Sequence, residues 1–234
     1  GLVGSEMCIR DRTYKEAFQK AIRSLETGRY GLGFAKDYNE KSKEELLRML
    51  ATPSSDRHFI MYEALRKGAT VDEIFDITKV KHYFVEQMKE LVEEEEAIAK
   101  SKGSLPSDEQ LISAKKNGFS DKYLSQILAI PEDDIRNKRI ELGIEEAWEG
   151  VHVSGTKDSA YYYSTYNAKD KNPVSEEKNK IMILGGGPNR IGQGIEFDYC
   201  CVHAALALKK LGFESIIVNL SLIHISEPTR PISI

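Results

Sequence analysis

Cysteine is scarce in this sequence, and neither sign of charge dominates. The three cysteines include the adjacent pair Cys200 and Cys201, which excludes a framework of disulfides and favours a reducing compartment. No apolar run reaches the roughly 18 residues that a membrane-spanning helix needs. The net charge is −4 and the pI about 5.8, so no basic excess points to nucleic acid or an anionic membrane as a partner. We expect a cytoplasmic protein with neither partner.

Both ends of the chain depart from the pattern of the rest. Residues 1–12 (GLVGSEMCIRDR) lack the apolar core of a signal peptide. Residues 220–234 (LSLIHISEPTRPISI) carry two prolines and follow no helical or strand period. Both strings resemble translated sequencing-adapter sequence, so we expect them to be artefacts without a function. Disordered termini are the alternative.

Residues 13–150 have the pattern of a helical bundle. Apolar residues recur at helical spacing, and several helix starts carry Ser or Thr followed three residues later by Glu. The pattern predicts about eight helices, beginning near Thr13, Ser42, His58, Thr70, Lys79, Ser107, Ser120 and Pro131. The longest of them carries an apolar stripe at helical spacing, made of Phe84, Met88, Leu91 and Ile98. The acidic run Glu93–Glu96 lies in the same helix and predicts a solvated face.

The character of the sequence changes after residue 150. Residues 151–179 are polar or charged and predict a connector, within which Ala160–Tyr166 (AYYYSTY) favours an extended segment. Lys180–Leu184 (KIMIL) predicts a fully buried parallel strand. A helix over about Ile195–Leu211 and a second strand over Ser215–Asn219 complete a β-α-β unit. The fold class is therefore a mainly α-helical bundle followed, over residues 180–219, by a truncated Rossmann-like α/β unit.

The stretch Leu184–Cys201 (LGGGPNRIGQGIEFDYCC) is the one most informative about function. Glycines between a buried strand and a helix allow a tight turn and a close approach to a ligand, and the helix N-terminus offers free N–H groups to an anion. The stretch matches neither G-x-G-x-x-G nor a complete P-loop. The pattern alone leaves open whether the loop contacts phosphate or only packs tightly.

The same stretch resembles the opening of the second synthetase half of the carbamoyl phosphate synthetase large subunit. Gly194 and the string Cys200–His203 match that half rather than the first. Upstream, Ala160–Tyr166 resembles the tyrosine motif before the second half, and Arg23–Gly31 (RSLETGRYG) resembles the end of the first half. The helical region then corresponds to the oligomerisation domain of the family. Val151–Ser159 is shorter than the family's segment and lacks its cysteine.

The resemblance implies a ligase that makes carbamoyl phosphate from bicarbonate, ammonia and two ATP, for arginine and pyrimidine biosynthesis. Ammonia usually comes from glutamine, through a small glutamine amidotransferase subunit or domain. The other implied partners are the remainder of the large subunit and, through the helical domain, further copies of the chain. ATP with Mg (or Mn) would bind the ATP-grasp domains of the full-length enzyme. We expect this chain to be a fragment that holds no catalytic residues and binds none of these groups.

The resemblance also implies roles for residues of the glycine-rich loop. Gly194 and Glu196 would border the internal tunnel that carries carbamate; otherwise Gly194 only permits a helix start and Glu196 complements the helix dipole. Asn189 and Arg190 are candidates for loop bracing or anion contact. The remaining loop glycines are Gly185, Gly186, Gly187 and Gly192.

Other residues of chemical interest favour packing roles. Cys200 and Cys201 have no CxxC or nearby His pair, so we expect small buried side chains and no metal site. His58 and His82 each stand alone in a helix. Two other functions remain open: a helical interaction module joined to a truncated nucleotide-binding lobe of another ATP-grasp or Rossmann enzyme, and a purely structural helical domain.

Overall fold

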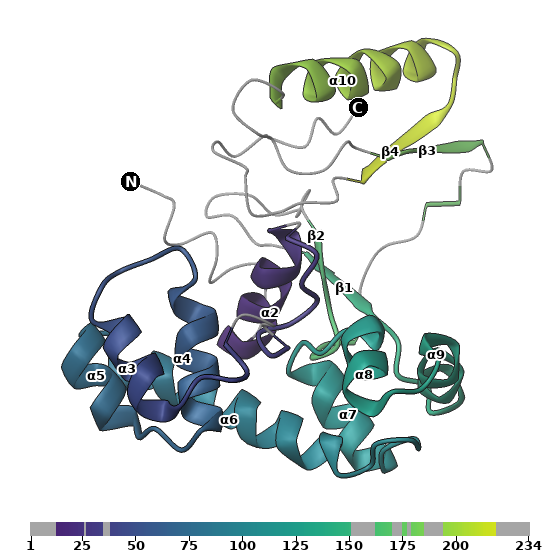
Figure 1. Ribbon diagram of the computed structural model, residues 1–234. Helices are drawn as coiled ribbons and strands as arrows, with labels where there is room; N and C mark the ends of the chain where they lie inside the picture. Colours follow the sequence, from purple (N-terminus) through teal and green to yellow (C-terminus); the bar gives the residue numbers. More distant parts are fainter. Residues whose placement is uncertain are drawn as a thin grey trace. The chain divides into compact units, whose positions relative to one another are not determined.

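The computed structural model describes residues 13–25, 27–34, 38–150, 162–169, 175–176, 179–184 and 194–218 (Figure 1). The chain divides into two compact units. The helical unit comprises Asp11–Glu146 and Thr165–Asn167, and the α/β unit comprises Gly1–Arg10, Ala147–Ser164 and Ala168–Ile234. The helical unit therefore includes three residues that follow its last helix by some distance in the sequence.

The described part of the helical unit contains the eight helices that the sequence predicts. They are α2 (Tyr14–Ser24), α3 (Lys43–Leu50), α4 (Arg57–Arg66), α5 (Val71–Thr78), α6 (His82–Ala99), α7 (Asp108–Lys116), α8 (Asp121–Leu128) and α9 (Glu132–Glu141). Helix α6 is the longest of them and packs against α2, α4, α5 and α8 (Figure 1). It is thus the helix around which the unit is arranged.

Side-chain caps explain where several of these helices begin. Complete capping boxes, in which side chain and backbone exchange hydrogen bonds, form between Ser42 and Glu45, between Thr70 and Glu73, and between Ser107 and Gln110. Each satisfies backbone N–H groups that a helix start leaves without an intrahelical partner. At the start of α2, the Thr13 side chain accepts from the backbone N–H of Glu16, but the Glu16 carboxylate has other partners, described below.

One predicted helix start is displaced. The sequence pattern predicts a helix from about Lys79, whereas α6 begins at His82. The reason is that Lys79 ends α5 in the left-handed region, with φ 56°, and its N–H bonds to Phe75 O. A residue in that conformation cannot continue or start a right-handed helix.

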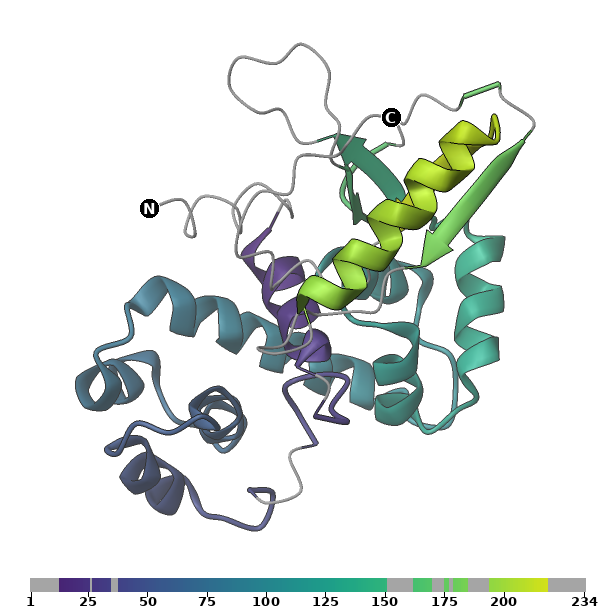
Figure 2. The same ribbon diagram turned by 90° about the horizontal axis from the view of Figure 1, so that it is seen from above.

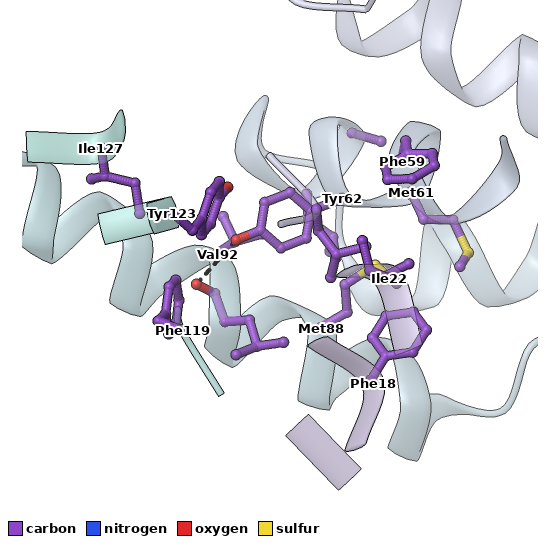
Figure 3. Packing of buried hydrophobic residues seen from close by; sticks show 14 of the residues in the cluster. Phe18, Ile22, Phe59, Met61, Tyr62, Met88, Val92, Phe119, Tyr123 and Ile127 are labelled. Carbon is purple, nitrogen blue, oxygen red and sulfur yellow. Dashed lines mark hydrogen bonds between the residues drawn. The ribbon is translucent and has the colours of Figure 1, made fainter. Parts of the chain in front are cut away.

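The apolar stripes of the helices meet in one core. Phe18 and Ile22 of α2, Tyr62 of α4 and Met88 of α6 belong to a single buried cluster (Figure 3). The ring of Tyr123 in α8 belongs to the same cluster and extends it to the far end of α6.

One residue of the predicted apolar stripe stays partly outside the core. Phe84, which the spacing assigns to the stripe of α6, is 39% exposed. It lies in the first turn of α6, where its ring contacts the rings of Tyr14 and Tyr83 at centroid distances of 5.2 Å and 5.4 Å. These three rings form a small aromatic group at the edge of the core.

The α/β unit contains the predicted strand–helix–strand order. Strand β3 (Lys180–Leu184) pairs in parallel with β4 (Glu214–Val218), and α10 (Gly194–Lys210) connects them and packs against both (Figure 2). A second two-stranded sheet joins β1 (Ala147–Gly150) to β2 (Tyr162–Thr165). The extended segment predicted within Ala160–Tyr166 is thus confirmed as β2, whereas β1 was not predicted.

The predicted full burial of β3 is wrong for this chain. Met182 is opposite Ile216 in the parallel register, so the two side chains lie on the same face of the sheet. They are 60% and 39% exposed. A parallel sheet needs cover on both faces, and among the helices of the described residues α10 is the one that packs closely against this pair of strands.

Within the described residues, none of the helices combines the length and the apolar character required to cross a membrane.

Candidate functional site

The glycine-rich loop joins β3 to α10. Six of its predicted site residues lie outside the described residues: Gly185, Gly186, Gly187, Asn189, Arg190 and Gly192. Gly194 is the first residue of α10, and Glu196 follows in its first turn, with a side chain that is not described. The loop therefore connects the carboxyl end of a parallel strand to a helix N-terminus, where open α/β sheets bind their ligands.

Two features of the described residues bear on the binding of a metal ion or a small molecule. They contain no group of three or more His, Cys, Asp or Glu side chains placed to hold a metal. A hollow of about 250 Å³ between α6 and α7 is lined by Glu94, Ala97, Ile98, Glu109, Gln110 and Ser113. The Glu94 carboxylate there already accepts hydrogen bonds from Ser113 Oγ (2.6 Å) and Asn117 Nδ2 (2.8 Å).

A buried carboxylate lies at the centre of the helical unit. Glu95 of α6 is 1% exposed, and its Oε2 accepts hydrogen bonds from the hydroxyls of Tyr62 (2.5 Å) and Tyr123 (2.7 Å). Arg66 of α4 donates to Oε1. The Tyr123 hydroxyl in turn accepts a 2.9 Å hydrogen bond from the backbone N–H of Gly33. We name Glu95 and these partners the Glu95 cluster.

The surroundings of Glu95 shift the pKa values of the side chains that bond to it. Burial, and after it the negative charge of Glu95, raises the pKa of the Tyr62 and Tyr123 hydroxyls well above the ordinary value. Both remain protonated donors throughout the neutral range. Although burial opposes the charge of Arg66, Glu95 and Glu63 raise the pKa of its guanidinium further. The Glu95 cluster is therefore a fixed ion pair with two donor hydroxyls rather than an acid–base site.

A second buried carboxylate holds the segment Thr165–Asn167. Glu16 of α2 is 0% exposed. Its Oε2 accepts from Thr165 Oγ1 (2.8 Å) and Asn167 Nδ2 (2.9 Å), and its Oε1 accepts from the backbone N–H of Tyr166 (3.3 Å). Lys20 lies one turn along α2, with its Nζ 3.7 Å from Oε1.

The ring of Tyr166 lies against two cations. Lys115 Nζ is 4.8 Å and the Arg139 guanidinium 5.8 Å from its centroid. Both cations pair with Asp121, at 2.7 Å and 3.1 Å. Burial lowers the pKa of Lys115 despite Asp121. For Asp121 the balance is reversed: burial favours a higher pKa, but Lys115 and Arg139 hold the pKa below its ordinary value.

The two histidines predicted to stand alone have local partners. His82 Nε2 is 2.9 Å from Asp72 Oδ1, and its ring centroid lies 4.2 Å from that of Phe75. The ring of His58 packs edge-on against Phe18 at 5.3 Å between centroids, and burial lowers the pKa of His58. These contacts agree with packing roles.

The expected burial of the cysteine pair is wrong. Cys200 is exposed and Cys201 only partly buried. Both lie in α10, which packs along one side against two strands. A helix covered on one side leaves the residues of its other side in water.

The roles of Glu95 and Glu16 were not predicted. The solvated face expected for Glu93–Glu96 is wrong at Glu95, and only its spacing from Leu91 and Ile98 on the apolar stripe could have marked it as buried. Glu16 has the spacing of a capping box, which predicts a local role rather than a distant one.

Comparison with known proteins assigns both units to the same family. Residues 6–143 match the family model described as "Carbamoyl-phosphate synthetase large chain, oligomerisation domain". Residues 177–229 match "Carbamoyl phosphate synthase preATP-grasp domain". The matched ranges include parts of both end segments.

Curated relatives agree with the family models. The carbamoyl phosphate synthase large chain of Nostoc sp. is 43% identical over 220 residues, and that of Pseudomonas aeruginosa is 43% identical over 223; each alignment covers 93% of this chain and 20% of the relative. The arginine-specific, chloroplastic large chain of Arabidopsis thaliana is 41% identical over 221 residues, which cover 93% of this chain and 18% of the relative. The chain thus spans about a fifth of the length of these relatives.

Proposed function

The chain belongs to the carbamoyl phosphate synthetase large-chain family, and from this premise we propose that it takes part in ATP-dependent synthesis of carbamoyl phosphate. The whole enzyme would be a ligase that uses bicarbonate, ammonia and two ATP, and its product would serve arginine and pyrimidine biosynthesis. The observation that carries the proposal is the order of the two matched domains along one chain, helical first and preATP-grasp second.

We assign the helical domain to residues 13–150, a connector to residues 151–179 and the opening of a Rossmann-like pre-ATP-grasp domain to residues 180–219. The helical domain would associate with further copies of the chain, in line with the name of its family model. The parallel β3–α10–β4 unit supports the second assignment, because such units are the building blocks of Rossmann-like folds. The end segments 1–12 and 220–234 would take no part.

ATP and Mg (or Mn) would bind elsewhere in the whole enzyme. The described residues do not fit a metal–nucleotide complex, since they present no cluster of metal-ligating side chains. Their buried carboxylates are already paired with donors or cations of the chain itself, and these are Glu16, Glu63 and Glu95. No step of phosphoryl transfer is therefore assigned to them.

The contribution of this chain to the chemistry would be to border the passage of carbamate. Carbamate decomposes in water, so a route between two active sites must be enclosed. Gly194 at the start of α10 would keep the bore open because it has no side chain, and Glu196 would hold polar intermediates or water. Asn189 and Arg190 would brace the glycine-rich loop or contact an anion. The glycines that would let the backbone turn tightly are Gly185, Gly186, Gly187 and Gly192.

The partners would be the remainder of the large subunit and a small glutamine amidotransferase subunit or domain that supplies ammonia. The scarcity of cysteine supports a location in a reducing compartment such as the cytoplasm.

A segment exchange tests the proposal. Residues 13–219 replace the corresponding segment of the Pseudomonas aeruginosa large chain, and we name the resulting protein the exchange enzyme. It is expressed in a strain that lacks its own large chain. We expect growth without added arginine and uracil, as with the unaltered large chain, whereas a large chain from which the segment is deleted supports none. An exchange enzyme that accumulates at the normal level without restoring growth contradicts the proposal.

A further inference from the structure

Three residues beyond the helices belong to the helical unit, and we name Thr165, Tyr166 and Asn167 the exit anchor. They lie 149 to 151 positions after Glu16 and supply three of its hydrogen bonds: one from the Thr165 hydroxyl, one from the Tyr166 backbone and one from the Asn167 amide. Thr165 is 1% exposed. Tyr166 and Asn167 are partly buried, so the exit anchor is seated in the unit through the side chain of Thr165.

Among the described residues, the exit anchor supplies the hydrogen bonds that the Glu16 carboxylate accepts. A fully buried carboxylate is costly unless hydrogen bonds replace its water, and Lys20 Nζ, at 3.7 Å, is beyond hydrogen-bond distance. In three other helices of the unit, the side chain three residues after the N-cap residue accepts a hydrogen bond from the N-cap backbone N–H, as the Glu45 side chain does from Ser42. Glu16 has the same spacing from Thr13 but bonds to the exit anchor. A residue placed as a local helix signal thus has a long-range role.

The second side of the exit anchor is held by different helices. The Tyr166 ring lies against Lys115 of α7 and Arg139 of α9, and Asp121 of α8 pairs with both cations. Asn167 Nδ2 donates to the backbone oxygen of Lys116 as well as to Glu16. Contacts from α2, α7 and α9 thus converge on three residues, and α8 fixes the cations among them.

Because Glu16 lies in the first turn of α2, these contacts join the first helix of the described residues to the last segment of the chain that belongs to the helical unit. We propose that Glu16 is a positioning residue, which fixes the exit anchor and so fixes where the connector to β3 departs from the helical unit. This inference rests on the proposed function, in which carbamate passes between two synthetase halves. A fixed departure point would keep the second half where it can receive carbamate before water destroys it.

The test measures carbamoyl phosphate formed per ATP consumed by the purified exchange enzyme carrying Glu16→Gln. The amide can accept at only one of the two oxygen positions, so at least one donor of the exit anchor loses its partner. We expect the product per ATP to fall several-fold, while ATP consumption continues, because carbamate made in the first half is lost. Amide exchange at Tyr166 and Asn167 should accelerate in the same variant.

Two further variants separate positioning from stability. Thr165→Val keeps the shape of the side chain and removes its donor, so it should lower the product per ATP in the same direction, and it carries the test if Glu16→Gln does not fold. Ile74→Val shortens a fully buried side chain of α5 by one carbon and should leave the product per ATP unchanged.

If both Glu16→Gln and Thr165→Val leave the product per ATP unchanged, the inference is overturned. It is also overturned if ATP consumption and carbamoyl phosphate formation fall together, so that the product per ATP stays the same. An inactive exchange enzyme without any substitution would instead count against the proposed function.

Discussion

The hydroxyl of Tyr123 in α8 donates a 2.7 Å hydrogen bond to the buried carboxylate of Glu95 in α6, and the same hydroxyl accepts from the backbone N–H of Gly33 at 2.9 Å. One oxygen atom therefore connects two helices and the loop after α2. Since all three groups are buried, none of them can turn to water if the hydroxyl is lost.

Replacement of Tyr123 by Phe should therefore destabilise the helical unit. The change leaves the Gly33 N–H without its partner and removes one donor from Glu95, and we expect a loss of about 1–3 kcal/mol in the free energy of unfolding. Urea denaturation followed by circular dichroism measures it. Tyr83→Phe, at a side chain that is 55% exposed, is the control and should stay within about 0.5 kcal/mol of the parent. Equal effects of the two changes would contradict the hydrogen bonds assigned to the Glu95 cluster.

Gly118 and Gly68 offer a matched pair for the packing of α2. Both have left-handed backbone, with φ of 94° and 90°, so alanine at either is strained by about 1–2 kcal/mol. A Cβ at Gly118 would also lie 2.9 Å from the Glu16 Cα, whereas one at Gly68 meets nothing within 4 Å. Gly118→Ala should thus lower the thermal midpoint clearly more than Gly68→Ala does. If the thermal midpoint of Gly68→Ala were as low as that of Gly118→Ala, α2 would not pack closely on the turn after α7.

Asp121 predicts a specific dependence of stability on pH. Lys115 and Arg139 hold its folded-state pKa below the ordinary value of 3.8, so its contribution is complete above that value and is lost as the pH falls through the folded-state pKa. The difference in unfolding free energy between the parent and Asp121→Asn should be largest at neutral pH and shrink on acidification below 3.8. Urea denaturation of both proteins across this range measures it. A difference that does not change with pH, or that grows in acid, contradicts the assigned ion pairs.

Gly194 can be tested by side-chain size in the exchange enzyme. Alanine and leucine are both good helix formers, so if Gly194 only starts α10, the two substitutions should behave alike. If it borders a narrow passage, Gly194→Leu should abolish most carbamoyl phosphate formation and Gly194→Ala much less, with ATP consumption retained in both. Steady-state rates of the two reactions distinguish the cases, and equal rates of synthesis for alanine and leucine remove the passage role.

The helices and the β-α-β unit could be predicted because their signals are local. Ser42 with Glu45 marks a helix start within one turn, and the mostly apolar run Lys180–Leu184 marks a strand within five residues. The roles of Glu16 and Glu95 could not be predicted from the sequence, because each carboxylate accepts its hydrogen bonds from residues at least 28 positions away. Strand β1 was missed for the same reason, since it pairs with β2, which lies further along the chain inside the connector.

The synthesis rate of the purified exchange enzyme decides whether residues 13–219 are a working part of a carbamoyl phosphate synthetase, as we claim. With bicarbonate, ammonia, ATP and Mg²⁺ supplied, we predict a rate within about ten-fold of the unaltered enzyme, equivalent to a loss of at most about 1.4 kcal/mol in transition-state stabilisation. A folded exchange enzyme that forms no carbamoyl phosphate from these substrates would contradict the claim.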